Sequence, residues 1–160
     1  GADVIAEKDG KAPLLIAGPG EYETRGVPIS GIPSWHDASS GAKEGKNTIY
    51  TVEFEDIRLC HLGDFGEKEL RNETLEAIGA VDILFLPVGG GTVLDPETAA
   101  AIANQLEPKI IVPMHYDKKV LDEFLKEIGA AGAAEDRLTT KRKELPEGKT
   151  EVRVLKPSFS

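Results

Sequence analysis

Hydrophobic and polar positions follow a β-type pattern in the first part of the chain. Short apolar runs bounded by glycine and proline predict strands at 13–17 and 27–32. Residues 47–63 predict a hairpin, because two strand-like segments flank a tight turn at Glu55 and Asp56. We therefore expect the first part of the chain to be rich in β-structure.

The second part of the chain alternates between helical and strand patterns. Apolar positions recur at helical spacing in three segments, and continuous apolar runs typical of buried strands lie between them. The predicted helices cover 68–79, 96–106 and 118–129, and the predicted strands cover 81–88, 109–114 and 151–156. A β-rich beginning followed by alternating elements argues for a layered α/β (α+β) sandwich.

Composition and charge narrow the class of protein. A chain of 160 residues, 40% of them hydrophobic, suffices for one domain with its own core, spanning 1–160. No apolar run reaches membrane-spanning length and no signal peptide opens the chain, so we expect no membrane partner. The net charge of −9 would repel nucleic acid, and the basic run at 141–143 is interpreted as a solvated loop. Cys60 is the only cysteine and cannot form an internal disulfide, which favours a cytoplasmic location.

Side chains that can bind a metal ion follow three of the predicted strands. His36 and Asp37 end the sequence SGIPSWHD, Asp64 follows RLCHLG, and His115 follows IIVPM. Sites in layered α/β proteins gather in loops beyond strand ends, and imidazole with carboxylate suits zinc, iron, manganese or nickel. Taken singly, a histidine in such a place is more often packed or solvated than a ligand. The spacing alone leaves both interpretations open.

The sequence GDFG at 63–66 is the most informative of these stretches. Its first glycine permits a sharp exit from the strand, which leaves Asp64 at the tip of a turn. The alternative is that Asp64 only accepts backbone hydrogen bonds within that turn. His61 has the opposite strand parity, so we expect it to be buried or partly buried away from Asp64. Cys60 and His61 are neighbours that point apart, which argues against a catalytic thiolate–imidazole pair.

Two glycine-containing stretches resemble nucleotide-binding loops only superficially. VGGGT at 88–92 lacks the lysine of a P-loop, and Asp95 would place negative charge where a phosphate binds. GPGEYETRG at 18–26 does not match the dinucleotide-binding pattern. We interpret both stretches as turns.

Four stretches, taken in order, resemble the metallo-β-lactamase superfamily. They are GPGEYETRGVPISGIPSWHD, NTIYTVEFEDIRLCHLGDFG, VDILFLPVGGG and PKIIVPMHY. More narrowly, the chain is similar to the small lactamase-B-like metal-dependent hydrolases of bacteria and archaea, from about residue 12 to the PMHY segment. The resemblance implies an αββα sandwich with a two-metal site at one edge of its two sheets.

The resemblance also implies roles for single residues. His36 matches the histidine that completes the first metal site, Asp64 the catalytic carboxylate that bridges both metals, and His115 the histidine of the second metal. Asp37 and Tyr116 are weaker expectations for residues that support those ligands. The implied cofactor is a divalent metal, with zinc expected: two ions in an intact relative, and one or none here.

The chain departs from the family pattern at one signature. It contains no H-x-H-x-D-H motif, which in the family lies upstream of the stretches that match here. Either the chain begins just after that loop, or the protein has lost it. We therefore expect the C-terminal three-quarters of the family fold, incomplete at its N-terminus and stabilised by an N-terminal segment or a second copy of the chain.

The function that the resemblance implies is metal-dependent hydrolysis of a small molecule. Metal-activated hydroxide would attack an ester, a lactone or a phosphodiester. With three of the ligands, the chain alone is expected to bind metal weakly and to hydrolyse little. The main alternative is a non-catalytic interaction or regulatory domain of the same fold, and a third is an unrelated α/β ligand-binding domain.

Overall fold

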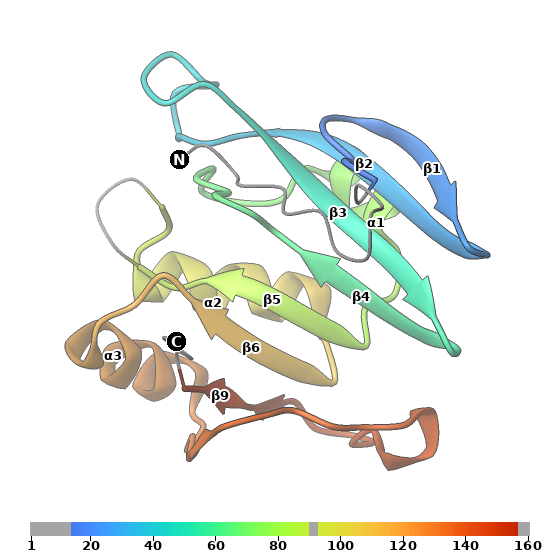
Figure 1. Ribbon diagram of the computed structural model, residues 1–160. Coiled ribbons are helices and arrows are strands. Elements are labelled where there is room, and N and C mark those ends of the chain that lie inside the picture. The colour runs from blue at the N-terminus through green and yellow to red at the C-terminus, as the bar shows by residue number, and fades with distance from the viewer. Residues whose placement is uncertain (1–13, 90–92, 157–160) are drawn as a thin grey trace.

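A computed structural model describes residues 14–89 and 93–156 (Figure 1). The elements are β1 (Gly20–Thr24), β2 (Val27–Trp35), β3 (Lys46–Phe54), β4 (Ile57–His61), α1 (Asn72–Ile78), β5 (Ile83–Pro87), α2 (Pro96–Leu106), β6 (Ile110–Met114), α3 (Lys118–Ile128), β7 (Ala134–Glu135), the 3-10 turn η1 (Arg142–Glu144), β8 (Glu151–Val152) and β9 (Val154–Leu155). A sheet with helices packed on it confirms the predicted α/β layered class.

Seven of the strands form one mixed sheet in the order β1-β2-β3-β4-β5-β6-β8. Strands β1 to β4 pair antiparallel, whereas β4, β5, β6 and β8 run parallel. The predicted hairpin is confirmed, since Glu55 and Asp56 turn between β3 and β4 with φ angles of 50° and 60°. Two left-handed residues in succession are typical of the tight hairpin turn whose twist matches the strands.

Two predictions near the N-terminus are wrong. Residues 14–17 form no strand, and Leu14 and Leu15 are exposed, while residue 13 lies outside the described residues. The stretch 18–26, interpreted as a turn, contains the edge strand β1, which pairs with β2 from Gly20 to Thr24. An apolar run forms a strand only where a neighbouring strand can pair with it. The edge strand β1 is polar, and its weak alternation of apolar residues gives little signal in the sequence.

Two other segments differ from their prediction, and a third lies partly outside the described residues. Helix α1 begins at Asn72 instead of residue 68, because Leu70 is held outside the helix by two hydrogen bonds to the Gln105 amide. The single strand predicted at 151–156 is two short strands, since β8 pairs with β6 whereas β9 pairs with β7. Residues 90–92 of the stretch VGGGT, which was interpreted as a turn, lie outside the described residues.

The two faces of the sheet are covered differently. We call the face that carries Cys60, Leu84 and Ile111 the helix face, because these fully buried side chains form one core with Ile102 of α2 and Phe124 of α3. In Figure 1, α1 and α2 lie behind the sheet on this side.

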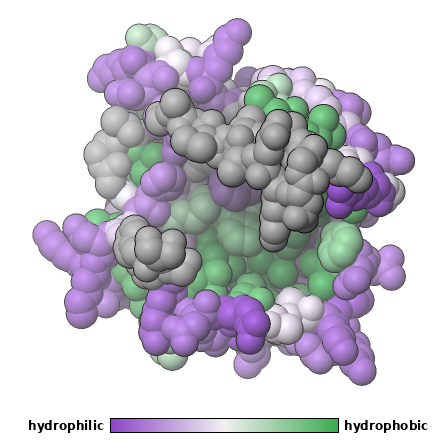
Figure 2. Space-filling model, viewed as in Figure 1, coloured by the Kyte–Doolittle hydropathy of each residue, from purple (hydrophilic) through white to green (hydrophobic). Residues whose placement is uncertain are grey.

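We call the other side of the sheet the open face. It carries Leu59 and Phe85, which are half-buried, and Ile83, which is covered by Leu145 of a segment spanning 136–146. Figure 2 shows hydrophobic residues gathered in the middle of this side, with hydrophilic residues around them. In the described part of the chain, one layer of helices therefore covers one face, and the irregular segment 136–146 covers part of the other.

Among the described residues, none of the helices has both the length and the apolar character needed to cross a membrane.

Candidate metal centre

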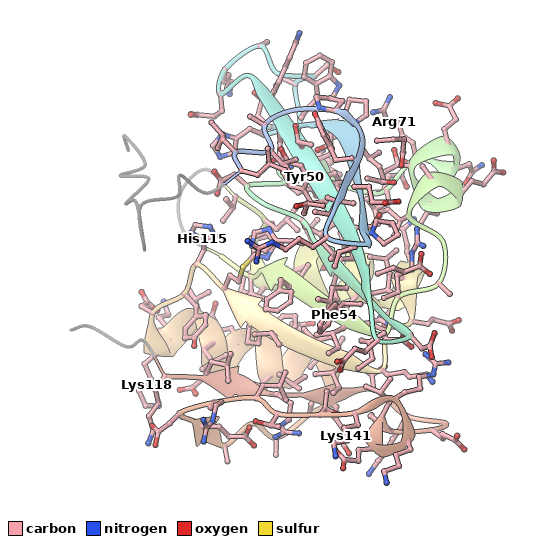
Figure 3. All side chains as sticks on the ribbon, turned by 45° about the vertical axis from the view of Figure 1, so that its right-hand side comes forward. Tyr50, Phe54, Arg71, His115, Lys118 and Lys141 are labelled. Atoms are coloured by element: carbon pink, nitrogen blue, oxygen red, sulfur yellow. The ribbon has the colours of Figure 1, made fainter. Side chains whose placement is uncertain are left out.

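The carboxyl ends of β4 and β6 bring Asp64 and His115 together. The two strands flank β5 in a parallel arrangement, so the residues that follow them leave the sheet at the same edge. Asp64 Oδ1 lies 3.1 Å from His115 Nε2, and each side chain is 51% exposed. In Figure 3, His115 lies at the left edge of the sheet. Both side chains line a hollow of about 610 Å³ at the edge of the open face. The predicted meeting of Asp64 with His115 is thus observed in the structure.

His61 is exposed and lines the same hollow, so the expectation that it is buried or partly buried away from Asp64 is wrong. Its ring stacks on Phe85 with centroids 5.7 Å apart, and its Nδ1 accepts a hydrogen bond of 3.0 Å from the Gly63 amide. The alternation of side chains along a strand does not extend to Asp64, because β4 ends at His61. Gly63, with φ of 60°, then turns the chain so that Asp64 lies on the same side as His61. Desolvation lowers the pKa of His61, the charge of His115 lowers it further, and Asp64 opposes both.

The backbone of His115 adopts a left-handed conformation, with φ of 52°. For a residue other than glycine this costs about 1–2 kcal/mol, so neighbouring interactions must hold it. Asp117, two residues later, supplies one of them by capping α3: its Oδ1 accepts from the Val120 amide at 2.9 Å. The sharp turn between β6 and α3 directs the imidazole towards Asp64 instead of continuing along the strand.

His36 lies where β2 ends, and its backbone contacts the loop that carries Asp64. The Gly66 amide donates to the Trp35 carbonyl at 3.1 Å, and a Cβ added at Gly66 would overlap the His36 carbonyl oxygen. Across residues 14–89 and 93–156, no three His, Cys, Asp or Glu side chains form a group that could hold one metal ion. Within these ranges, the structure thus brings Asp64 and His115 together without grouping a third such side chain with them. A shared metal site that also includes His36 stays a prediction.

Asp37 and Tyr116, which were expected to support the metal ligands, form hydrogen bonds with backbone groups. The buried Asp37 carboxylate accepts hydrogen bonds from four backbone amides, which lowers its pKa, most strongly through Glu44. Tyr116 donates to the Leu155 carbonyl at 3.1 Å and packs against the core of the helix face. Asp37 thus closes the loop after His36, and Tyr116 anchors β9; a supporting role for either towards a metal ligand stays a prediction. The amides bound to Asp37 belong to Ser39, Gly41, Lys43 and Glu44.

Asn47 is a residue of the hollow that the sequence interpretation did not single out. It is the second residue of β3, and its side chain reaches the loop that carries Asp64. The only signal in the sequence is a polar amide at the beginning of a strand that continues with β-branched and aromatic residues. That signal is weak, because asparagine is common wherever a strand begins after a loop.

The donor set at this edge suits a divalent metal ion. Two donors that share a tetrahedral zinc ion, each about 2.0–2.1 Å from it, are about 3.3 Å from one another. The 3.1 Å between His115 Nε2 and Asp64 Oδ1 is close to that separation. Imidazole and carboxylate are also the ligand types that zinc and iron accept. The two side chains therefore fit as part of a metal centre.

Comparison with known proteins identifies the family of this chain. Its residues 3–115 match the sequence profile of the beta-lactamase superfamily domain. A UPF0173 metal-dependent hydrolase of Thermococcus onnurineus is 36% identical over 102 residues, which are 61% of this chain and 44% of that protein. A relative of the same name from Thermococcus kodakarensis is 32% identical over 120 residues, covering 72% of this chain and 52% of that protein. The chain thus spans about half the length of the curated relatives it matches.

Solved structures show the same fold. A proposed Zn-dependent hydrolase of the metallo-β-lactamase superfamily from Thermotoga maritima superposes with a TM-score of 0.72 and 32% identity, covering 88% of this chain and 70% of that chain. The diiron β-hydroxylase CmlA of Streptomyces venezuelae superposes with a TM-score of 0.56 over 90% of this chain and 33% of that chain. At 12% identity, the second match shows the fold alone.

Proposed function

Because the chain belongs to the metallo-β-lactamase superfamily, we propose that it is the part of a metal-dependent hydrolase that carries Asp64, His115 and His36 as metal ligands. The observation that carries the proposal is the 3.1 Å approach of Asp64 Oδ1 to His115 Nε2 at the edge of the sheet. The names of the relatives, which are metal-dependent hydrolases, support the same activity.

A divalent metal bound at this edge would supply a water molecule acidic enough to act as a nucleophile near neutral pH. The protein's own contribution is to hold the two donors at a fixed separation beside a hollow that admits a small molecule. The Nδ1 atom of His61 is engaged by the Gly63 amide, so Nε2 is the ring nitrogen that it can offer to a bound molecule. We propose an ester, lactone or phosphodiester as substrate, zinc as the metal, and the cytoplasm as the location.

The open face supports a second part of the proposal, namely that another protein layer completes the site. Half-buried Leu59 and Phe85 lie on this face next to His61, and the relatives have about as much chain again outside the matched region. We propose that an N-terminal segment carrying the remaining ligands packs there, and a second copy of the chain is the alternative occupant. The chain alone should then hold metal weakly and hydrolyse little.

The experiment compares the chain with a version extended into the upstream reading frame. Elemental analysis and assays with a generic phosphodiester and a lactone should show two metal ions and turnover in the extended protein, and at most one weakly held ion here. Asp64→Asn should remove metal from the extended protein, whereas Asp122→Asn, a change on the exposed surface of α3, should not. Two tightly held ions with robust turnover in the 160-residue chain would contradict the incomplete site, and unchanged metal content in Asp64→Asn would contradict the ligand role.

The second candidate function is a non-catalytic interaction or regulatory domain. It is favoured by the finding that the described residues do not group three metal-binding side chains. The upstream reading frame separates the two candidates, because a histidine-rich loop there supports the enzyme and a degenerate one supports the non-catalytic domain.

A further inference from the structure

We infer that Asn47 is the positioning residue of the Asp64 turn: its amide fixes residues 62–64 so that the Asp64 carboxylate faces His115. The inference rests on the proposed function, in which Asp64 is a metal ligand. Asn47 belongs to β3, the strand next to β4, and its side chain reaches the turn that follows β4. Asn47 acts on geometry alone: its side chain holds the backbone of residues 62–64, and Asp64 is the proposed ligand in that segment.

The Asn47 side chain binds the turn on both sides of Gly63. Nδ2 donates to the Leu62 carbonyl at 2.9 Å, and Oδ1 accepts from the Asp64 amide at 3.0 Å. The backbone pairing of β3 with β4 ends at Tyr50 and His61, so beyond that point the side chain takes the place of a strand neighbour. The side-chain amide of Asn47 therefore forms hydrogen bonds with both the carbonyl before Gly63, that of Leu62, and the backbone amide after it, that of Asp64.

The orientation of the Asn47 amide is fixed by Ser34. Nδ2 also donates to Ser34 Oγ at 2.9 Å, and the Ser34 hydroxyl donates to the Asn47 carbonyl at 3.3 Å. Ser34 is buried, so these bonds form where water does not compete for them. A backbone amide can only donate, which requires Oδ1 to face Asp64, and Nδ2 then faces the two acceptors.

Gly63 shows how closely the turn is fitted to Asn47. A Cβ added at Gly63 would lie 2.6 Å from Asn47 Oδ1, closer than real Cβ contacts come. The φ angle of 60° at Gly63 adds a second reason for glycine at this place. The sequence HLGD thus makes this turn because glycine leaves room for a side chain from another strand.

The Asp64–His115 pair needs such support because it is exposed. With both side chains 51% exposed, their mutual attraction is screened by water and contributes little order. The turn beneath them is ordered instead by hydrogen bonds: His61 Nδ1 accepts from Gly63, and Asn47 accepts from Asp64. Removing the Asn47 amide should release the turn and widen the range of positions that Asp64 adopts.

The first measurement is amide hydrogen exchange at Asp64 in the full chain. Asn47→Ala should accelerate this exchange at least about tenfold, and Asn47→Asp, which keeps an acceptor for the Asp64 amide, should restore part of the protection. Asn104→Ala, the same change at an exposed position of α2, is the matched control and should leave the exchange unchanged. Unchanged exchange in Asn47→Ala would overturn the inference.

The second measurement is the affinity for zinc in a mutant cycle. Asn47→Ala should weaken zinc binding by about 10- to 100-fold, the usual effect of removing a group that orients a ligand. In the Asp64→Asn background, where only weak zinc binding by the other ligands remains and is measured by titration at high zinc concentration, the same change should have no further effect, because Asn47 acts through Asp64. Equal losses in both backgrounds would show a merely structural role and overturn the inference. If zinc affinity is indifferent to Asp64→Asn, the proposed function fails, and the exchange of the Asp64 amide alone decides the role of Asn47.

Discussion

The helix face and the open face of the sheet carry similar residues but have different surroundings. On the helix face, Cys60 and Leu84 are fully buried beneath α2 and α3. On the open face, their neighbours Leu59 and Phe85 stay half-buried, although they are just as apolar. A strand that is apolar on both sides is typical of a sheet covered on both sides. The strands of this chain thus have the composition of a three- or four-layer protein, while its described residues provide full cover on one side.

The candidate metal centre lies on the less covered side. His61 is exposed on the open face, and the hollow that it shares with Asp64 and His115 opens at the edge of that face. A layer packed on the open face would therefore border the site directly. The difference links two proposals, because further protein that covers the open face would also complete the candidate metal centre. Three predictions test the difference between the faces.

The largest effect is expected for the reactivity of Cys60. Burial raises the pKa of this thiol from 9.0 to about 12, so at pH 8 the folded protein has about a thousand times less thiolate than an unfolded chain. The neutral thiol is favoured in the fold, so its contribution to stability is complete below pH 9 and is lost as the pH rises from 9 towards 12. A thiol reagent should modify Cys60 only as fast as the chain unfolds. Rapid modification of the native protein at pH 8 would show that the helix face opens readily.

A matched pair of leucines should separate the faces by stability. Leu84→Ala on the helix face should lower the free energy of unfolding by about 3 kcal/mol, because it leaves a cavity in a fully buried core. Leu59→Ala on the open face should cost about 1 kcal/mol, since part of that side chain already contacts water. Urea unfolding followed by circular dichroism measures both. Equal losses would mean that the open face is covered in solution, for example by a second copy of the chain.

The smallest effect is expected for Arg142, which fastens the segment 136–146 to the sheet. Its Nη1 lies 2.9 Å from Oδ2 of Asp82, a buried carboxylate that also accepts from the Arg58 amide. Arg142→Met should therefore lower the free energy of unfolding by less than about 1 kcal/mol, because half of the Arg142 side chain is exposed and Asp82 keeps its other partners. Arg137→Met, at an exposed position of the same segment, serves as control. No difference between the two variants would mean that the apolar side chains of the segment, Leu138 and Leu145, hold it without the ion pair. The basic run at 141–143 is thus only partly the solvated loop that was predicted, since Arg142 belongs to an ion pair.

The fold was largely predictable because its main elements have strong local signals. The hairpin turn at Glu55 and Asp56 and the helix capped by Asp95 depend on neighbours within a few residues, and both formed as predicted. The predicted strand at 13–17 failed, since its apolar residues find no strand to pair with. The edge strand β1 was missed because it is defined by its partner β2 rather than by its own composition.

The sequence by itself determined which residue types follow β4 and β6, while the meeting of Asp64 with His115 was implied by the resemblance to the family. Strand ends follow from apolar patterning, which acts over short stretches of chain. Only the tertiary structure decided that His61 joins them, that His115 adopts a left-handed backbone, and that Asn47 holds the turn. The positions of His61 and Asn47 depend on contacts between segments far apart in the chain, namely the stacking of His61 on Phe85 and the hydrogen bonds of Asn47 to residues 62 and 64, whereas the His115 conformation belongs to the turn between β6 and α3.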